Sequence, residues 1–377
     1  SSKFSIIGYN LSIGSLFIVS TLNSFNKKSL IIHLLFIIHE LSFGRKYVWD
    51  KKLQDGIFCK IIPLKGNPLK SINIYMVKSK DEAMIIDTGF NTEEIKSEML
   101  SFIRDMEVNL NKTILFLTHL HSDHTGLANW FSDELGVEIY MGDIDYKMMS
   151  SMADANSKRW REVMGTTHMQ GLDEDNLKIW EHAGFKYRPK NEFPYISFNP
   201  GYILKIGDFS FTGMDFSGHT PGMVGLYEKD KKILFCGDHL LKKITPNITF
   251  WNFLVGDSLG RYLKNIEKLR NLPIDHIYSS HRDLIEDVPK RIDELENHHK
   301  KRIGEAFETL NRNKEGTVRD IAMNMSWDMR AKDFSEFPNT QKFFAAGEAH
   351  AHLEYLRAIG KAGVKKDENG VLKYFAI

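Results

Sequence analysis

Three histidines and an aspartate fall within six consecutive residues of this chain, in the run His119-Leu120-His121-Ser122-Asp123-His124. Such residues are seldom gathered in a protein core for packing alone. Imidazole nitrogens and carboxylate oxygens are donors that Zn²⁺ accepts. The run follows the apolar segment Ile114–Leu117, so it lies at the end of a predicted buried strand. A loop of this kind predicts a site where alternate side chains point at two neighbouring cations.

Further candidate ligands follow other strand-like segments. His219 stands in the turn-like sequence Gly218-His219-Thr220-Pro221-Gly222, and Asp238 and His281 each end an apolar run. Taken singly, each of them is a common turn or capping residue. Together they follow strands in an order that would complete two coordination spheres. His239, next to Asp238, is predicted to be a hydrogen-bond donor behind the ligands, to help the leaving group, or to be a structural histidine with its hydrogen bonds satisfied.

The elements that must position these residues alternate between strand and helix patterns. Short apolar or alternating runs predict strands at Gly56–Ile62, Ser71–Val77, Ala83–Ile86, Ile114–Leu117, Val137–Tyr140, Tyr202–Lys205, Asp208–Gly213, Met223–Tyr227, Lys232–Cys236 and His276–Ser279. Helical patterns predict helices at Thr92–Asn109, Leu127–Glu134 and Asp257–Leu269. This alternation indicates sheets covered by helices, which is an α/β layered domain.

The length of 377 residues suggests about two domains. The formal net charge of +1 gives no global attraction to nucleic acid or to an anionic membrane. The two cysteines, Cys59 and Cys236, form no CxxC pair, which favours a reducing, cytoplasmic compartment. We expect an apolar extension at residues 1–45, a catalytic domain at 46–287 and a further domain at 288–377. Membrane contact through residues 4–38 stays open, because Phe4–Leu22 nearly reaches spanning length.

Two segments interrupt or follow the α/β pattern. Residues 144–182 are polar and helix-like, and we expect this insertion to cover the metal cleft. Helices are predicted at Arg291–Leu310, Thr317–Met325 and Gln341–Ile359, followed by a hairpin around Asn369-Gly370. Three helices and a hairpin predict a winged helix. Its acidic and basic residues nearly balance, so we expect no DNA binding. A buttressing role, a homodimer contact or RNA contact through Lys365 and Lys366 stays open.

The set His119-x-His121-x-Asp123-His124, His219, Asp238 and His281 resembles the ligands of the metallo-β-lactamase superfamily, and Ile86-Asp87-Thr88-Gly89 resembles its first motif. The resemblance implies a four-layer αββα sandwich. It implies a first metal on His119, His121 and His219. It implies a second metal on Asp123, His124 and His281, with Asp238 bridging the two. By the same resemblance, Asp87 braces the histidine loop.

Two such cations share a hydroxide and polarise the substrate oxygen, so no serine or cysteine nucleophile is needed. Zn²⁺ is the first candidate, with Fe or Mn as alternatives. True β-lactamases generally lack a bridging carboxylate, and we therefore disfavour that activity. The segments Ile61-Ile62-Pro63-Leu64 and Gly347-Glu348-Ala349-His350-Ala351-His352-Leu353 are similar to lactamase-beta-2-like proteins and, more distantly, to glyoxalase II.

This similarity implies hydrolysis of a small ester, thioester or lactone, with Asp123, Asp238 and His239 as candidate catalytic residues. The first alternative is a metal-dependent endoribonuclease. A less favoured alternative is a nucleic-acid-binding regulator that uses the winged helix.

Overall fold

The computed structural model describes residues 51–329 and 331–377 of the chain. The predictions of an apolar extension at 1–45 and of membrane contact through 4–38 fall outside the described residues. Within the described part of the chain, none of the helices combines the length and the apolar character needed to cross a membrane.

The first sheet carries the histidine loop. It has the strand order β1 (Lys51–Gln54), β2 (Ile57–Pro63), β3 (Ser71–Ser79), β4 (Glu82–Ile86), β5 (Thr113–Leu117), β6 (Glu138–Met141) and β7 (Ile196–Ser197). The pairs from β4 to β7 are parallel; α3 (Glu93–Asp105) lies between β4 and β5, and α5 (Ala128–Asp133) lies between β5 and β6. The carboxyl ends of parallel strands share one edge of a sheet. The residues after β4 and β5 therefore meet at that edge.

The second sheet has five strands in the order β12-β11-β10-β9-β8. Their bounds are β8 (Ile203–Ile206), β9 (Phe209–Asp215), β10 (Val224–Glu228), β11 (Ile233–Gly237) and β12 (His276–Ser279). β8 to β11 are antiparallel neighbours, whereas β11 and β12 are parallel and are joined through α9 (Ser258–Leu269). The segments that follow β9, β11 and β12 carry the other candidate ligands.

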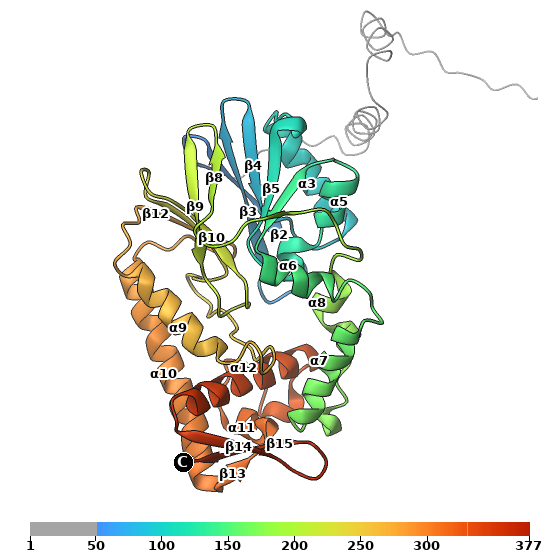
Figure 1. Ribbon diagram of the computed structural model, residues 1–377, viewed down its shortest axis with the longest axis vertical. Helices are drawn as coiled ribbons and strands as arrows, with labels where there is room; N and C mark the ends of the chain where they lie inside the picture. Colours follow the sequence, from blue (N-terminus) through green and yellow to red (C-terminus); the bar gives the residue numbers. More distant parts are fainter. Residues whose placement is uncertain (1–50, 330) are drawn as a thin grey trace, which may run out of the picture. The chain divides into compact units, whose positions relative to one another are not determined.

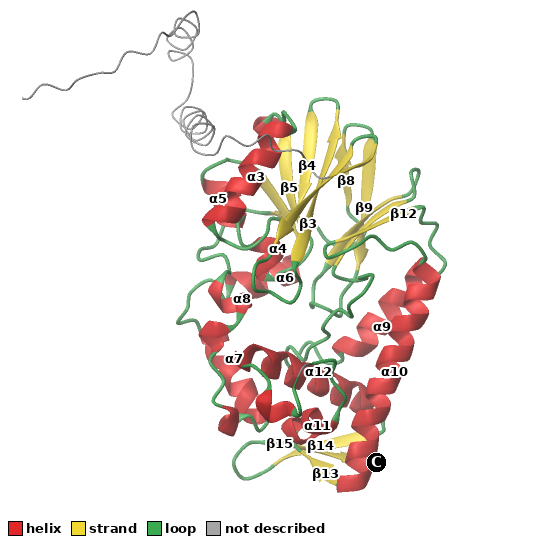
Figure 2. Cartoon of the chain, turned by 180° about the vertical axis from the view of Figure 1, so that it is seen from behind, coloured by secondary structure: helices red, strands yellow, loops and turns green. Residues whose placement is uncertain are grey.

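The two sheets pack face to face and bury a core that includes Tyr75, Phe116, Phe211 and Phe235. Helices α3 and α5 lie beside the first sheet, while α9 and α10 (Val288–Asn313) lie beside the second (Figures 1 and 2). The apolar side of α9 joins strands β10 and β11 in a further core cluster. The predicted α/β class, with two sheets and helices around them, is confirmed.

Residues 144–182 contain helices and turns. They form α6 (Asp143–Ser150), α7 (Lys158–Met169) and two 3-10 turns, and α8 (Ala183–Lys186) follows. The Ser122 hydroxyl, in the histidine loop, donates to the Ala183 carbonyl over 3.1 Å. Between α7 and α8 the segment contacts the C-terminal helices, since Asp175 pairs with Arg319 at 2.7 Å and with Lys342 at 2.8 Å. It therefore reaches from the candidate ligands to the C-terminal region.

The C-terminal region consists of α10, α11 (Val318–Asn324) and α12 (Asn339–Ala358), followed by the hairpin β14 (Ala362–Lys366) and β15 (Leu372–Ala376). A two-residue strand, β13 (Glu315–Gly316), pairs with β15. Asp287 caps α10, and Thr317 with Asp320 forms a capping box at α11. The three helices and the hairpin agree with the sequence prediction. α12 packs against α9 and α10, so this region adjoins the second sheet's helices.

Candidate metal centre

His119, His121 and His219 direct three ring nitrogens at one another. Nδ1 of His121 lies 3.1 Å from Nε2 of His119 and 3.0 Å from Nε2 of His219. His119 and His121 come from the loop after β5, and His219 comes from the turn between β9 and β10. Facing lone pairs repel one another unless a proton or a cation lies between them. These three residues form a group that could hold a metal ion.

Asp123, His124 and His281 form a second such group. Oδ2 of Asp123 lies 3.4 Å from Nε2 of His281 and 3.7 Å from Nε2 of His124. Asp238 lies between the two groups. Its Oδ1 is 3.3 Å from Nε2 of His281, and its Oδ2 is 3.7 Å from Nε2 of both His124 and His219. The seven ligands predicted from the sequence are therefore brought together.

Four atoms at this centre are buried and have no hydrogen-bond partner among the described residues: Oδ2 of Asp123, Nε2 of His124, Oδ1 of Asp238 and Nε2 of His281. Buried polar atoms without partners are costly, and native structures contain few of them. Here the four atoms converge, and they are nitrogen and carboxylate oxygen donors. This donor set fits divalent cations.

The outward-facing nitrogen of each of three histidines meets an acceptor. Nδ1 of His124 lies 2.8 Å from Asp87 Oδ2, Nδ1 of His281 lies 2.7 Å from the Ser71 carbonyl, and Nδ1 of His219 lies 2.8 Å from the Asn247 carbonyl. An acceptor at Nδ1 requires a proton there, so in the neutral ring the lone pair is on Nε2 and points into the site. These contacts set the tautomer and the ring orientation that metal ligation needs.

Asp87 occupies the place expected for a carboxylate that braces the histidine loop. Besides His124, it accepts a hydrogen bond of 2.9 Å from the backbone N–H of Thr118, the residue before His119. Its φ of 65° lies in the left-handed region, which is uncommon for a non-glycine residue. The turn after β4 thus directs this buried carboxylate at the loop that follows β5.

Asp145 also holds the ligand loops, and sequence reasoning missed it. Its carboxylate accepts from Leu120 N at 3.0 Å, from Thr220 Oγ1 at 2.6 Å and from Gly222 N at 2.6 Å. It therefore joins the loop that carries His119 and His121 to the turn that carries His219. Burial raises its pKa to about 6, against the effect of these hydrogen bonds. In sequence, Asp145 is a helix-start aspartate like Asp143, and no local signal distinguishes the two.

The ionisable groups of the centre influence one another strongly. Burial lowers the pKa of His121 to about 3. Burial also opposes charge on His281, but the carboxylates of Asp238 and Asp123 outweigh it and raise the pKa of His281 to about 10. Protons and cations therefore compete for the same nitrogens, and metal binding to such a site releases protons.

His239 lies apart from this group of donor atoms. Its ring stacks on Phe216 with centroids 4.2 Å apart and meets Tyr262 edge-on at 5.3 Å. Neither ring nitrogen has a hydrogen-bond partner within the described parts of the chain, and burial lowers its pKa to about 3. The structure shows no contact through which His239 would pass a proton to a leaving group. The ring is thus buried between aromatic side chains, and the role of His239 stays a prediction.

Aromatic side chains stand beside the first group of histidines. The Trp251 ring lies 6.0 Å from that of His121, and its Nε1 donates to the His219 carbonyl over 3.3 Å. The neighbouring Phe253 and Leu254 are exposed. At the end of the insertion, the His182 ring lies 5.2 Å from Phe344 of α12.

Cys236 is fully buried, and burial raises the pKa of its thiol to about 12, so it is a neutral thiol in the core.

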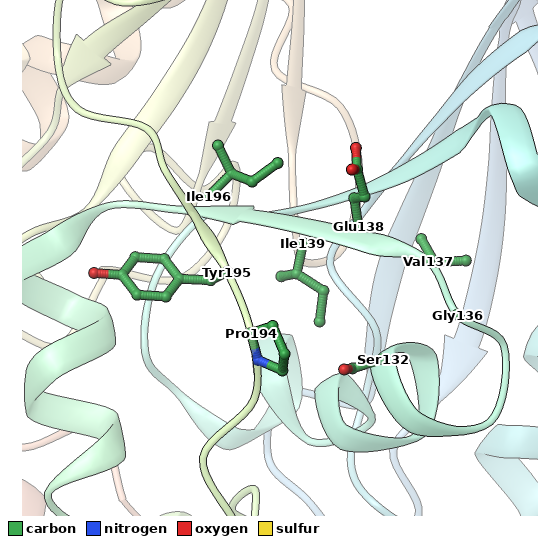
Figure 3. A pocket seen from close by; sticks show the side chains of 8 residues that line it. All are labelled: Ser132, Gly136, Val137, Glu138, Ile139, Pro194, Tyr195 and Ile196. Atoms are coloured by element: carbon green, nitrogen blue, oxygen red, sulfur yellow. The ribbon is translucent and has the colours of Figure 1, made fainter.

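A separate pocket of about 280 Å³ opens on another part of the first sheet (Figure 3). It is lined by Ser132, Gly136, Val137, Glu138, Ile139, Pro194, Tyr195 and Ile196. Ser132 belongs to α5 and the other residues lie at or just before the start of β6 and β7, whereas the histidine loop follows the end of β5. The pocket contains none of the candidate ligands and is not part of the metal centre.

A family model described as the metallo-beta-lactamase superfamily matches residues 67–281, a range that runs from before Asp87 to His281. The solved structure of a metallo-beta-lactamase family protein, TTHA1429 from Thermus thermophilus, shares the fold. The TM-score is 0.73 at 22% identity, over 86% of this chain and 100% of that chain. This likeness of fold reaches well beyond the residues that the family model matches.

Two curated relatives have named activities. The hydroxyacylglutathione hydrolase GloC of Haemophilus influenzae is 30% identical over 160 residues, which are 42% of this chain and 62% of the relative. The acyl-coenzyme A thioesterase MBLAC2 of Homo sapiens is 26% identical over 202 residues, which are 50% of this chain and 64% of the relative. The match thus spans less than two thirds of either relative.

Proposed function

This chain belongs to the metallo-beta-lactamase superfamily of hydrolases, and we propose that it uses two metal ions to hydrolyse a small thioester, with esters and lactones as related substrates. The observation that carries the proposal is the set of four buried, converging donor atoms without partners among the described residues. The position of Asp238 between the two groups supports two ions rather than one.

In this proposal, His119, His121 and His219 hold the first ion, Asp123, His124 and His281 hold the second, and Asp238 holds both. Two such cations lower the pKa of water from about 15.7 towards 7 and polarise a carbonyl oxygen. The chain's own contribution is to fix the donors. Asp87 and the Ser71 carbonyl hold a proton on Nδ1 of His124 and His281, so Nε2 is the nitrogen that would bind an ion once its own proton has been displaced.

The donors are imidazole nitrogens and carboxylate oxygens, so Zn²⁺ is the proposed metal, with Fe or Mn as alternatives. The thiol of Cys236 contributes no ligand, because it is buried in the core cluster of α9 and the second sheet. The site also differs from the one that we expect in a true β-lactamase, because a carboxylate lies between its two groups of ligands and no thiolate lies beside that carboxylate.

The substrate class rests on two lines of support. The named activities of the two curated relatives, hydroxyacylglutathione hydrolase and acyl-coenzyme A thioesterase, both concern thioesters. In addition, Trp251 lies against His121, and Phe344 lies beside His182, which precedes α8. We propose that these aromatic rings contact the acyl part of the substrate, since apolar and aromatic groups line most small-molecule sites.

We further propose that residues 46–287 form the catalytic domain and that residues 288–377 form a winged helix that buttresses it. The order α10, α11, α12 and the three-stranded sheet β13-β15-β14 support this. We propose no DNA-binding role, because the acidic and basic residues of this domain nearly balance and both cations named on α12 are engaged in ion pairs. Lys342 pairs with Asp175, Arg357 with Glu354 and Lys365 with Glu315.

A hydrolysis panel on the metal-loaded protein tests the proposal. It contains lactoylglutathione, acyl-coenzyme A thioesters, a lactone, an aryl ester and single-stranded RNA. We expect the highest kcat/KM on a thioester and its loss in Asp238→Asn. The control is Asp133→Asn, an exposed residue at the end of α5. Cleavage of RNA without any ester or thioester hydrolysis would instead identify an endoribonuclease.

A further inference from the structure

The loop of residues 242–257 holds the ligand His219 at two points. The Asn247 carbonyl accepts from Nδ1 of the His219 ring at 2.8 Å, and Nε1 of Trp251 donates to the His219 carbonyl over 3.3 Å. The loop contains neither helix nor strand. His281 and His124, in contrast, meet acceptors at the start of β3 and after β4 of the first sheet. The orientation of His219 therefore depends on whatever holds the loop.

Helix α12 of the C-terminal region holds this loop. Phe250 N donates to the Gly347 carbonyl over 3.1 Å. The Asn247 side-chain amide reaches Glu348 Oε2 at 3.4 Å, while Glu348 Oε1 accepts from Arg302 Nε of α10 at 3.2 Å. The Glu348 carboxylate thus joins the residue that orients His219 to the longest helix of the C-terminal region.

The Arg302 end of this connection is firmly held. Its side chain is almost fully buried, and its guanidinium lies over the Trp327 ring at 4.0 Å from the centroid. It also pairs with Glu305 at 3.3 Å. A cation fixed in this way attracts the Glu348 carboxylate and keeps it in place, since charge-assisted hydrogen bonds are the stronger ones.

The helix and the loop also approach closely at Gly347. A Cβ atom at this position would lie 2.1 Å from Oγ1 of Thr249, which is too close for any real contact. A side chain here would force the Thr249 side chain to turn away or the loop to shift from α12. Gly304 of α10 offers a comparison, because a Cβ there would meet nothing within 4 Å among the described residues.

We propose that Glu348 is a positioning residue for the metal centre, and that α12 sets the Asn247 carbonyl and thereby the direction of His219 Nε2. This inference rests on the proposed function, since it concerns a ligand of the first metal ion. Partners that orient a ligand histidine commonly change metal affinity 10- to 100-fold when they are removed. The C-terminal region would then be part of the active enzyme, although it supplies no ligand.

The test compares metal binding in Glu348→Gln, Asn247→Ala and the matched pair Gly347→Ala and Gly304→Ala. A glutamine at 348 carries one acceptor and one donor, so it cannot accept from both Arg302 and Asn247. The two alanine variants favour their helices alike and differ in the contact with the loop. Affinity is measured by chelator competition, and ligand geometry by the visible spectrum of the Co²⁺-loaded protein. Apo-protein unfolding midpoints are measured in parallel.

We expect Glu348→Gln, Asn247→Ala and Gly347→Ala to lower the affinity for one of the two metal ions at least tenfold and to change the visible spectrum of Co²⁺ at that site. The second ion and Gly304→Ala should behave as in the wild type. Two ions held at wild-type affinity by all variants would overturn the positioning role and leave the proposed function standing. Equal loss of both ions, together with a lowered unfolding midpoint, would also overturn it. A wild-type protein that binds no metal pair would remove the inference and the proposed function together.

Discussion

Nδ1 of His124 lies 2.8 Å from Oδ2 of Asp87, which stands 37 residues earlier in the chain. The two residues follow neighbouring parallel strands, β5 and β4, and so they meet at one edge of the first sheet. The same carboxylate accepts from Thr118 N at 2.9 Å. A single buried side chain therefore holds both the start of the histidine loop and one of its proposed ligands.

Replacing Asp87 by alanine should release His124 and leave the Thr118 N–H unsatisfied. We expect metal affinity to fall about 10- to 100-fold and the free energy of unfolding to fall by about 1–3 kcal/mol. Chelator competition and urea unfolding of the apo protein measure the two effects. Asp133→Ala, at an exposed position, is the control. Unchanged metal affinity in Asp87→Ala would contradict the bracing role.

Asp238→Asn tests the shared carboxylate. An amide carries no charge to offset two dications, so we expect the metal content to fall from about two ions to one per chain and activity to fall by more than about 100-fold. Elemental analysis after gel filtration, together with thioester turnover, checks this. Two tightly held ions in the variant would show that the ions do not need a bridging carboxylate.

Asp145→Asn tests the link between the two ligand loops. An asparagine retains one acceptor atom and places an amide group towards hydrogen-bond donors. We expect weaker binding of the first metal ion, and a loss of about 1–3 kcal/mol for each donor left without a partner. Asp143→Asn is a matched control in the same helical turn, since Asp143 contacts Tyr195 and Asn199 instead of the ligand loops. Equal metal affinity in both variants would rule out this role.

His350 should make stability depend on pH. Its ring is buried against Phe250 at 3.7 Å, and burial lowers its pKa to about 3. An unfolded histidine has a pKa of about 6.5, so below that pH the unfolded chain binds a proton that the folded chain excludes. Stability is therefore fully present above about pH 6.5 and is lost as the pH falls towards 3.

Between pH 7 and pH 5 this single group should account for about 2 kcal/mol of lost stability. His350→Gln should reduce the pH dependence by that amount, whatever its effect on stability at pH 7. Urea unfolding at the two pH values measures it. An unchanged difference between them would show that His350 is already protonated, or exposed, in the folded protein.

The full chain should not bind duplex DNA with submicromolar, salt-sensitive affinity. Binding of that kind needs phosphate contacts from free lysines and arginines. On α12, Lys342 and Arg357 are engaged with Asp175 and Glu354. Fluorescence anisotropy with a labelled duplex at two salt concentrations checks this. Tight binding that weakens steeply with salt would favour the nucleic-acid-binding alternative.

Much of the fold was predictable because long apolar runs and turn signals mark the main strands and helices. Thr92 and Asp257 cap α3 and α9 where the sequence predicted these helices to begin. The strands β7 and β13 were missed because they have only two residues each, and β1 was missed because Leu53 is its only apolar residue. Their pairing depends on neighbours that are distant in the sequence.

The candidate ligands were predictable because histidines and aspartates at strand ends form an unusual pattern. The residues that orient these ligands give weaker signals in the sequence. Asn247 acts through its backbone carbonyl, which every residue possesses. Asp145 resembles any acidic residue at a helix start. His239 is the opposite case, a residue that the sequence suggested and that lies apart from the donor atoms. Its place next to Asp238 in the sequence does not determine the direction of its buried ring.

The donors divide between the two sheets, with His119, His121, Asp123 and His124 after β5 and with His219, Asp238 and His281 on the segments of the second sheet. This division has a consequence for biosynthesis. A chain that has left the ribosome only as far as the first sheet offers an incomplete set of donors. Stable loading must then wait until the second sheet has formed. Metal uptake would therefore be a late event. It would occur after both sheets have been translated and have packed together, and the bound metal would then link them.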